Sequence, residues 1–506
     1  MKKIADYFGI IFIFVLMIAG CGGGDSRALP AAFDLRDVEG RSYVTPVKTQ
    51  GAQLPDGNFD LGTSVGLCWA FSSMASFESS LLMHGIVTDA NAPSANLSAW
   101  HLGNWNGRNN PVYVFNNNLM PGTNPPLTFG YTQNEPVIKG WGGDSRSAID
   151  FFSSGKGPVL EQDAPFPLDM VSHHLLLVPP PEALPVLYRL KEALIFSRDD
   201  YSGDEEFRNV IKHALTIYGV IQSYVYFDAA GYPGQIGPSF FDRDTGTYYC
   251  DDPAKVGQFG HGVAIIGWDD NKDVPKAPGK GAWLIKNSLG TRFGEDGYYW
   301  VSYNDAVFLK EYSFAVAFIA GTKQGYGNPS DYQTHDGALS QITFTIGDNA
   351  YDYLSDDFAD AGADQWASAR FVATSDNLLK AVGFITGNRN EAVTVQVYGG
   401  WDISNNRPEG LLSSQTAYLA DKGYRTVTLD TPVAVTNGQE FVIALGFAGN
   451  PGQRKASLVY VVDPKTPVLT EKTYRNYHGV SGWGDWVDYA TLNGGSIFYV
   501  QAIMEK

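Results

Sequence analysis

A cysteine stands at the start of an apolar pattern in the stretch GLCWAFSSM, residues 66 to 74. The pattern continues at the spacing of one helix face, with Ala70, Met74, Phe77 and Leu81. It predicts a helix that begins near Cys68. Because a helix N-terminus carries partial positive charge, a thiol placed there is biased toward the nucleophilic thiolate. A lone cysteine in an apolar run is more often an inert core residue, so other residues of the chain must decide.

A nucleophilic thiolate needs a base, and the base needs a group that orients it. His261 in GHGVAIIGWDD comes directly before an apolar run that predicts a buried strand. Asn287 ends a second predicted strand in GAWLIKNSLG, and a Gly-rich turn and a third strand from Tyr298 follow. Gln50 in TPVKTQG adds a side-chain amide upstream of the cysteine. Together these residues predict nucleophilic catalysis by a thiol.

The order of these motifs resembles the papain and cathepsin family of cysteine peptidases, over residues 31 to 318. The resemblance implies a two-lobe α+β fold, protein or peptide substrates and no cofactor. It implies Cys68 as the nucleophile, His261 as general base and acid, and Asn287 as the group that orients the imidazole. It also implies Gln50 as a donor of the oxyanion hole. Gly142 and Gly143 in GWGGDS would pair through their backbone with an extended substrate.

Some positions depart from the family pattern. Val65 and Gly140 stand where the family joins two loops with a disulfide. Leu289 and Phe293 replace two tryptophans near the asparagine. In the family, the tryptophan at the position of Leu289 shields the bond between histidine and asparagine from water. Leucine covers less area, so we expect reduced efficiency with activity retained.

The first twenty residues indicate export. Lys2 and Lys3 precede an apolar run, residues 8 to 18, which is too short to span a bilayer comfortably. The run ends in Ile-Ala-Gly-Cys, residues 18 to 21, which resembles the bacterial lipobox. We therefore expect a signal peptide at 1–20, a lipid on Cys21 that holds the protein at a membrane of the bacterial cell envelope, and a tether at 21–30. The alternative is an ordinary secretory signal that is cleaved elsewhere.

The chain has three cysteines and a net charge of −18. If Cys21 carries lipid and Cys68 is the nucleophile, Cys250 remains as a partly buried free thiol or as a regulatory partner of Cys68. The acidic charge disfavours a nucleic-acid partner. The pair His173 and His174 has no neighbouring ligands at metal spacing, so we expect no metal site.

The character of the chain changes after residue 318. Residues 319–336 are rich in Gly and polar residues and predict a linker. Residues 337–506 show period-two alternation, for example at Val393, Val395 and Val397, which predicts an all-β antiparallel, jelly-roll-like sandwich whose strands pair among themselves.

The order of these strands resembles the lectin-like domain that follows papain-like domains in exported prokaryotic proteins. The resemblance implies carbohydrate or another cell-surface polymer as a partner. Four tryptophans could stack on a sugar or simply pack within the sandwich: Trp366, Trp401, Trp483 and Trp486.

The sequence thus predicts a lipid-anchored bacterial cysteine endopeptidase with a C-terminal β-sandwich. The alternative is a non-catalytic surface adhesin or wall-binding lipoprotein on a peptidase scaffold.

Overall fold

The computed structural model describes residues 29–51, 66–105, 143–153, 155, 157–166, 184–228, 239–258, 260–322, 364–373, 375–405 and 407–447. It also describes shorter segments at 131–132, 135–136, 332–333, 460–462, 473–479, 482–483, 487–488, 496–498 and 500–505. The predictions for Cys21 and the tether, Val65, Gly140, Gly142, the histidine pair at 173–174 and Trp486 lie outside these residues.

The N-terminal domain combines helices with a mostly antiparallel sheet. Its helices are α2 (Cys68–Met83), η2 (Pro93–Ala95), α3 (Ala99–Trp105), α5 (Ser145–Ser153), η3 (Arg198–Asp200), α6 (Asp204–Tyr218) and η5 (Pro253–Lys255). Its strands are β1 (Ala32–Asp34), β2 (Tyr131–Thr132), β3 (Glu135–Pro136), β4 (Tyr188–Ser197), β5 (Ile221–Val225), β6 (Phe241–Asp242), β7 (Thr247–Tyr248), β8 (His261–Asp269), β9 (Ala282–Lys286), β10 (Tyr298–Ser302) and β11 (Phe314–Thr322). In this sheet, β7 and β10 pair in parallel. Among the described residues, no helix has the length and apolar character needed to cross a membrane.

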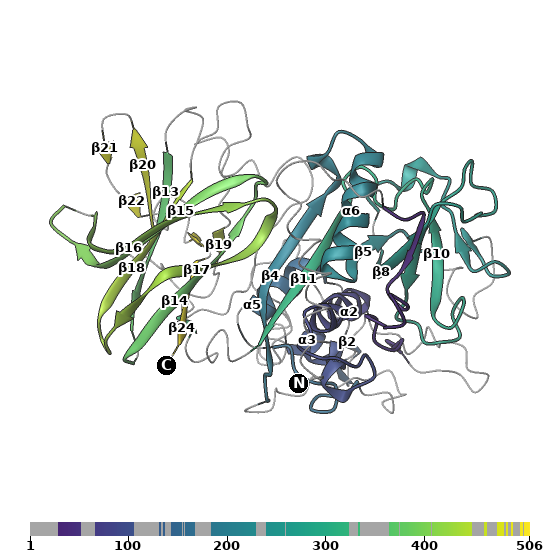
Figure 1. Cartoon of the computed structure of the whole chain (residues 1–506), viewed down its shortest axis with the longest axis horizontal. Helices are drawn as coiled ribbons and strands as arrows, with labels where there is room; N and C mark the ends of the chain where they lie inside the picture. Colours follow the sequence, from purple (N-terminus) through teal and green to yellow (C-terminus); the bar gives the residue numbers. More distant parts are fainter. Residues whose placement is uncertain are drawn as a thin grey trace, which may run out of the picture.

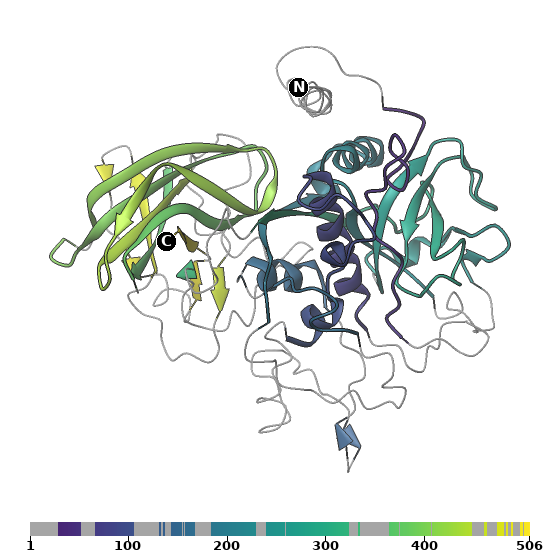
Figure 2. The ribbon, with the colours of Figure 1, turned by 60° about the horizontal axis from the view of Figure 1, so that its bottom comes forward.

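Helix α2 begins at Cys68, where the apolar pattern predicts it, and runs through the middle of this domain (Figures 1 and 2). Almost all of its residues are buried, including several serines. Ser76 Oγ donates to the carbonyl of Val220 (2.7 Å) and accepts from the backbone N–H of Phe318 (3.1 Å). Ser80 Oγ accepts from the N–H of Ala320 (2.9 Å). These hydrogen bonds satisfy buried polar groups and fix the helix against the sheet.

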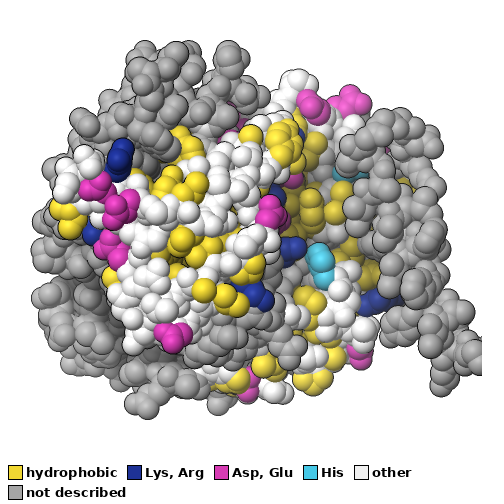
Figure 3. Space-filling model, turned by 60° about the vertical axis from the view of Figure 1, so that its left-hand side comes forward, with side chains coloured by type: hydrophobic (Ala, Val, Ile, Leu, Met, Phe, Trp, Pro, Cys, Tyr) yellow, Lys and Arg dark blue, Asp and Glu magenta, His cyan; other side chains and the backbone are white. Residues whose placement is uncertain are grey.

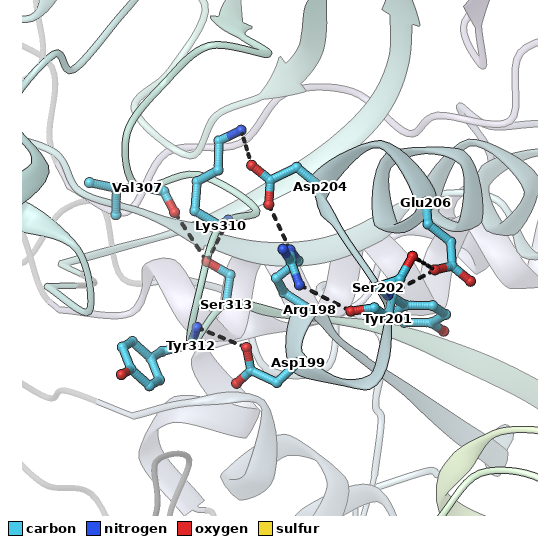
Figure 4. A network of polar contacts seen from close by, with 10 residues as sticks. All are labelled: Arg198, Asp199, Tyr201, Ser202, Asp204, Glu206, Val307, Lys310, Tyr312 and Ser313. Carbon is cyan, nitrogen blue, oxygen red and sulfur yellow. Dashed lines mark hydrogen bonds and ion pairs between the residues drawn. The ribbon is translucent and has the colours of Figure 1, made fainter.

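A polar cluster holds the loop between β10 and β11 against α6 (Figure 4). Asp204, the first residue of α6, accepts from Arg198 Nε (2.6 Å) and from Lys310 Nζ (2.8 Å). Ser313 Oγ donates to the carbonyl of Val307 (3.1 Å). The acidic side chain also lies where the positive end of the helix favours it. The cluster therefore fixes the start of β11 beside the start of α6.

The C-terminal domain is the β-sandwich that the alternating pattern predicts. Its strands are β12 (Tyr332–Gln333), β13 (Asp364–Val372), β14 (Asn377–Thr386), β15 (Glu391–Asp402), β16 (Arg407–Leu419), β17 (Lys422–Val435), β18 (Glu440–Phe447), β19 (Tyr460–Val462), β20 (Thr473–Gly479), β21 (Gly482–Trp483), β22 (Val487–Asp488), β23 (Ser496–Phe498) and β24 (Val500–Glu505).

One layer of the sandwich has the order β16-β15-β18-β13-β20-β21, and the other contains β12-β24-β14-β17. Val393, Val395 and Val397 are fully buried between the layers, as their alternation predicts. Trp366 and Trp401 are buried in a smaller cluster with Val442 and Ala444.

The second layer does not end at the sandwich, because β17 pairs with β4 of the N-terminal domain. The sheet continues as β17-β4-β11-β5-β8-β9-β10-β7-β6 (Figure 1). Lys422 Nζ lies 2.7 Å from Asp200 Oδ2, and Gln501 Nε2 donates to the carbonyl of Ser153 (2.9 Å). The prediction that the later strands pair only among themselves is therefore wrong. The domain end predicted at residue 318 falls within β11.

Gly423 makes this junction sterically possible. Its φ is +124°, and a Cβ atom at this position would overlap the carbonyl oxygen of Ala193 on β4. We expect Gly423→Ala to lower the free energy of unfolding by about 3 kcal/mol, from backbone strain and from forced separation of β17 and β4. Urea unfolding of the full chain, together with proteolysis at the junction, measures the effect.

Gly438 provides the matched control, because its φ is +80° and no atom lies within 4 Å of a Cβ placed there. Gly438→Ala should cost only the backbone strain, about 1 kcal/mol. Equal losses for the two variants would show that the β17–β4 contact tolerates a side chain.

Candidate active site

The site forms where β8 approaches the first turn of α2. Cys68 is the first residue of α2, and His261 is the first residue of β8. A Cβ atom on Gly262 would lie 2.9 Å from the backbone nitrogen of Trp69. Only glycine therefore allows the strand to come this close to the helix. The sequence analysis missed the role of Gly262, although the dipeptide His-Gly before a buried strand signals a close backbone approach.

Cys68 and His261 stabilise each other's charged forms. Burial alone would raise the pKa of the Cys68 thiol, but the hydrogen bond and charge of His261, with the backbone N–H groups of Gly262 and Trp69, lower it. Burial alone would lower the pKa of His261, which is 1% exposed, but hydrogen bonds to Cys68 and Asn287 and the charge of Cys68 raise it. Both shifts favour a thiolate–imidazolium pair.

Asn287 fixes the tautomer of the imidazole. His261 Nε2 lies 2.8 Å from Asn287 Oδ1, and the backbone N–H of Ser288 donates to the same oxygen at 2.8 Å. Since the backbone N–H can only donate, this atom of Asn287 is an acceptor, and His261 Nε2 must carry the proton that it donates. The other ring nitrogen is then the one that exchanges a proton with Cys68.

Ser288 is a second residue that the sequence analysis missed. Its hydroxyl donates to Gln50 Oε1 (2.7 Å), and its carbonyl accepts from the backbone N–H of Gln50 (2.9 Å). With its oxygen held in this way, the amide of Gln50 presents Nε2 on the opposite side. The turn after β9 therefore orients both the imidazole and the amide predicted for the oxyanion hole.

A buried ionic network supports these two segments. Glu78 on α2 accepts from Thr45 Oγ1, from Lys48 Nζ (2.6 Å) and from the backbone N–H of Leu97 (2.8 Å). Lys286 Nζ donates to Thr45 Oγ1 (3.0 Å), and burial lowers its pKa to about 8. Lys48 precedes Gln50 by two residues, and Lys286 directly precedes Asn287. The network therefore ties both segments to the helix that carries Cys68. A glutamate as the one charged residue of the α2 segment is the sequence signal for it.

Other residues singled out in the sequence also lie in or near the site. Leu289 and Phe293 are buried, at 1% and 2% exposure, and Phe293 stacks on Phe241 with ring centroids 4.6 Å apart. A Cβ on Gly143 would overlap the indole of Trp69, so packing alone requires glycine there. Its predicted role in substrate binding stays a prediction, as does that of Gly142.

Cys250 is buried with a free thiol, and its pKa is raised to about 11 by burial. Among the described residues, no group of three His, Cys, Asp or Glu side chains could hold a metal ion.

Comparison with known proteins identifies both domains. Residues 189–317 match the family model of papain family cysteine proteases, and residues 350–480 match that of a lectin-like domain. Cathepsin S of Mus musculus is 35% identical over 96 residues, which are 19% of this chain and 23% of that protein. Cathepsin S of Bos taurus is 45% identical over 60 residues, 12% of this chain and 16% of that protein. The chain thus matches less than a quarter of the length of these relatives.

Solved structures show the same arrangement of domains. The clostridial cysteine protease Cwp84 after propeptide cleavage aligns with a TM-score of 0.63 and 18% identity, over 94% of this chain and 99% of that one. The cysteine protease and lectin-like domains of Cwp84, a surface layer associated protein of Clostridium difficile, align with a TM-score of 0.64 and 18% identity. The alignment covers 96% of this chain and 90% of that one. The chain therefore contains a segment that matches the papain family of cysteine proteases, followed by a segment that matches a lectin-like domain. The fold class that the sequence predicts is confirmed.

The ion pair can be tested by the pH dependence of alkylation. We expect iodoacetamide to modify Cys68 at a pH well below the free-thiol pKa of about 8.5, because His261 holds the thiolate. The rate should fall only as the pH drops through the lowered pKa of Cys68. Mass spectrometry of the modified peptide gives the rate at each pH.

Cys250 is the internal control, since its raised pKa and burial should leave it unmodified over the same range. In His261→Ala, reaction of Cys68 should shift to alkaline pH. A wild-type profile with one rise near pH 8.5 would contradict the pair.

Proposed function

We propose that the chain is a cysteine endopeptidase that hydrolyses peptide bonds in proteins. The observation that carries the proposal is the close approach of Gly262, next to His261, to the backbone of Cys68 and Trp69, with His261 Nε2 held 2.8 Å from Asn287 Oδ1. A charged thiolate next to an oriented imidazolium is the arrangement that thiol nucleophiles need.

In the proposed first step, Cys68 Sγ attacks the carbonyl carbon of the scissile bond, and the carbonyl electron pair moves onto its oxygen. The amide of Gln50 and the backbone N–H of Cys68 donate to this oxyanion. The oxyanion then collapses, the C–N bond breaks, and His261 gives its proton to the leaving amine. The result is a thioester on Cys68.

In the second step, neutral His261 takes a proton from a water molecule, and the oxygen of that water attacks the thioester carbonyl. Collapse of this second oxyanion breaks the C–S bond and releases the carboxylic acid. Cys68 leaves as a thiolate and His261 keeps the proton, so the ion pair is restored.

A graded series of variants tests this chemistry. Cys68→Ala should abolish hydrolysis of an unstructured protein substrate with the fold retained, because a methyl group cannot attack but fits the space. Gln50→Ala should lower kcat on a peptide about 10²–10³-fold, the typical loss for one oxyanion-hole donor. Ser288→Ala should lower it only about fivefold, because it removes one neutral hydrogen bond worth about 1 kcal/mol.

Circular dichroism of each variant controls for folding. Equal hydrolysis by Cys68→Ala and the wild type would overturn the assignment. A well-folded wild type that cleaves no protein would favour the alternative, a surface adhesin on a peptidase scaffold.

We also propose that the protein is exported and held at a bacterial membrane by lipid on Cys21. The lipobox-like residues 18 to 21 support this. Trp268 Nε1 donates to the carbonyl of Pro30 (3.1 Å). Eight residues separate Pro30 from Cys21, so the domain would lie within about 30 Å of the bilayer surface.

The lectin-like domain is proposed to bind neutral carbohydrate at the cell surface. Uncharged side chains form a ladder between two of its strands. Thr394 Oγ1 lies 2.9 Å from Thr416 Oγ1, and Gln396 Nε2 donates to Ser414 Oγ (3.3 Å). On this side of the molecule, the described surface carries both acidic and basic side chains, with uncharged side chains between them (Figure 3). Hydroxyl and amide groups suit a ligand that is itself rich in hydroxyls.

Two measurements test the lipid anchor and the binding of carbohydrate. Mass spectrometry of the mature N-terminus should find a diacylglycerol-modified Cys21, and Cys21→Ser should be released from membranes by a high-salt wash. An unmodified N-terminus elsewhere would refute the anchor. The released variant should still sediment with isolated cell-wall polysaccharide, and its failure to do so would refute carbohydrate binding alone.

A further inference from the structure

The imidazole of His261 has an aromatic neighbour that the proposed chemistry does not use. The ring centroid of Phe227 lies 5.2 Å from that of His261, with an angle of 39° between the ring planes. Phe227 is 8% exposed and His261 is 1% exposed. The two rings therefore meet inside the protein.

The pairing of β5 with β8 brings Phe227 to this position. Val225, the last residue of β5, is the register partner of His261, and its carbonyl accepts from the backbone N–H of Gly260 (3.3 Å). Phe227 follows Val225 by two residues. The backbone that carries Phe227 is thus fixed directly beside the backbone that carries His261.

Other rings hold Phe227 in place. It stacks on Tyr248 with centroids 5.6 Å apart and an interplanar angle of 17°, and it contacts Phe293 at 5.8 Å. Tyr248 in turn donates its hydroxyl to the carbonyl of Tyr226. Phe227 therefore has little room to move away from the imidazole.

The hydrogen bonding of His261 does not by itself prevent rotation of the imidazole about its Cβ–Cγ bond. Its Nε2 lies 2.8 Å from Asn287 Oδ1, and Cys68 raises the pKa of the same ring. Such a rotation would break the hydrogen bond to Asn287 and turn the ring away from Cys68. A rigid group packed against the face of the ring opposes this rotation.

We propose that Phe227 is a positioning residue that holds the imidazole of His261 between Cys68 and Asn287. This inference rests on the proposed function, since it assigns Phe227 a part in the same ion pair.

Loss of this contact should narrow the pH range in which the pair exists. The hydrogen bonds to Cys68 and Asn287 raise the pKa of His261, and His261 lowers the pKa of Cys68. If the ring turns away, the pKa of His261 and the pKa of Cys68 both move back toward the values of the isolated groups. The acid limit of the pair then rises and its alkaline limit falls.

The test compares variants of the full chain at two positions in the same aromatic cluster. Phe227→Ala removes the contact, and Phe227→Leu keeps apolar bulk without a ring. Phe241→Ala is the matched control, because Phe241 is also buried and contacts Phe293 and Tyr299. No ring contact between Phe241 and His261 occurs among the described residues. Two readouts are measured against pH: the rate of Cys68 alkylation by iodoacetamide, and kcat and KM on a short fluorogenic peptide.

We expect Phe227→Ala to move the acid limit of Cys68 alkylation to higher pH and to narrow the pH window of kcat/KM from both sides. It should also lower kcat about ten- to hundredfold, with a smaller change in KM. Phe227→Leu should recover part of the window, which also keeps the test informative if the alanine variant unfolds. Phe241→Ala should leave the window at its wild-type limits even where it lowers thermal stability.

The role of Phe227 would be overturned if folded Phe227→Leu and Phe227→Ala both kept the pH limits of the wild type. It would also be overturned if Phe241→Ala narrowed the pH range as much as Phe227→Ala. Failure of the proposed function is distinguishable. In that case the wild type itself would lack thiolate reactivity at low pH and would not hydrolyse the peptide.

Discussion

The arrangement of this molecule depends on one close approach, that of β8 to the first turn of α2. Gly262 allows it, because a side chain there would meet the backbone of Trp69. The approach places His261 against Cys68, and neither charge could exist alone at this depth. Burial pushes each group toward its neutral form. Hydrogen bonding and charge between the two groups reverse both shifts, with help from Asn287 for His261 and from backbone N–H groups for Cys68. The pair is therefore a property of two backbones in contact.

The surrounding residues keep that contact in register. Ser288 binds both Asn287 and Gln50, so one turn sets the orientation of the imidazole and of the amide together. Glu78 connects the same region to α2, and it is almost completely buried. A buried carboxylate is stable only with its full set of partners, here the ammonium of Lys48, the hydroxyl of Thr45 and a backbone N–H. Such a network specifies one relative placement of helix and strand ends.

Residue types and local patterns were enough to predict much of this site and both domains. Cys68, His261, Asn287 and Gln50 carry chemistry that few other residue types can perform, and each stands beside a recognisable periodic segment. Ser288, Gly262 and Glu78 were missed because their partners are distant in the chain and their types are common. The serines of α2 were also not informative until the strands that accept their hydrogen bonds were in place.

The pairing of β17 with β4 escaped prediction for a related reason. Period-two alternation shows that a strand has an inner and an outer face, but it does not show which strand lies along its edge. The positive φ of Gly423 and the contact with Ala193 depend on that edge, so they emerge only from the fold. Asp200 of η3, which follows β4, and Lys422 at the start of β17 gave no local sign that they would meet.

The continuous sheet also determines how the two domains share mechanical constraints. Backbone hydrogen bonds between β17 and β4 fix distance and direction, whereas a flexible hinge would fix neither. On the proposed function, a surface bound by the lectin-like domain would meet the peptidase at one distance and one angle. The peptidase would then select the bonds that it cuts by their distance from the bound surface as well as by their sequence.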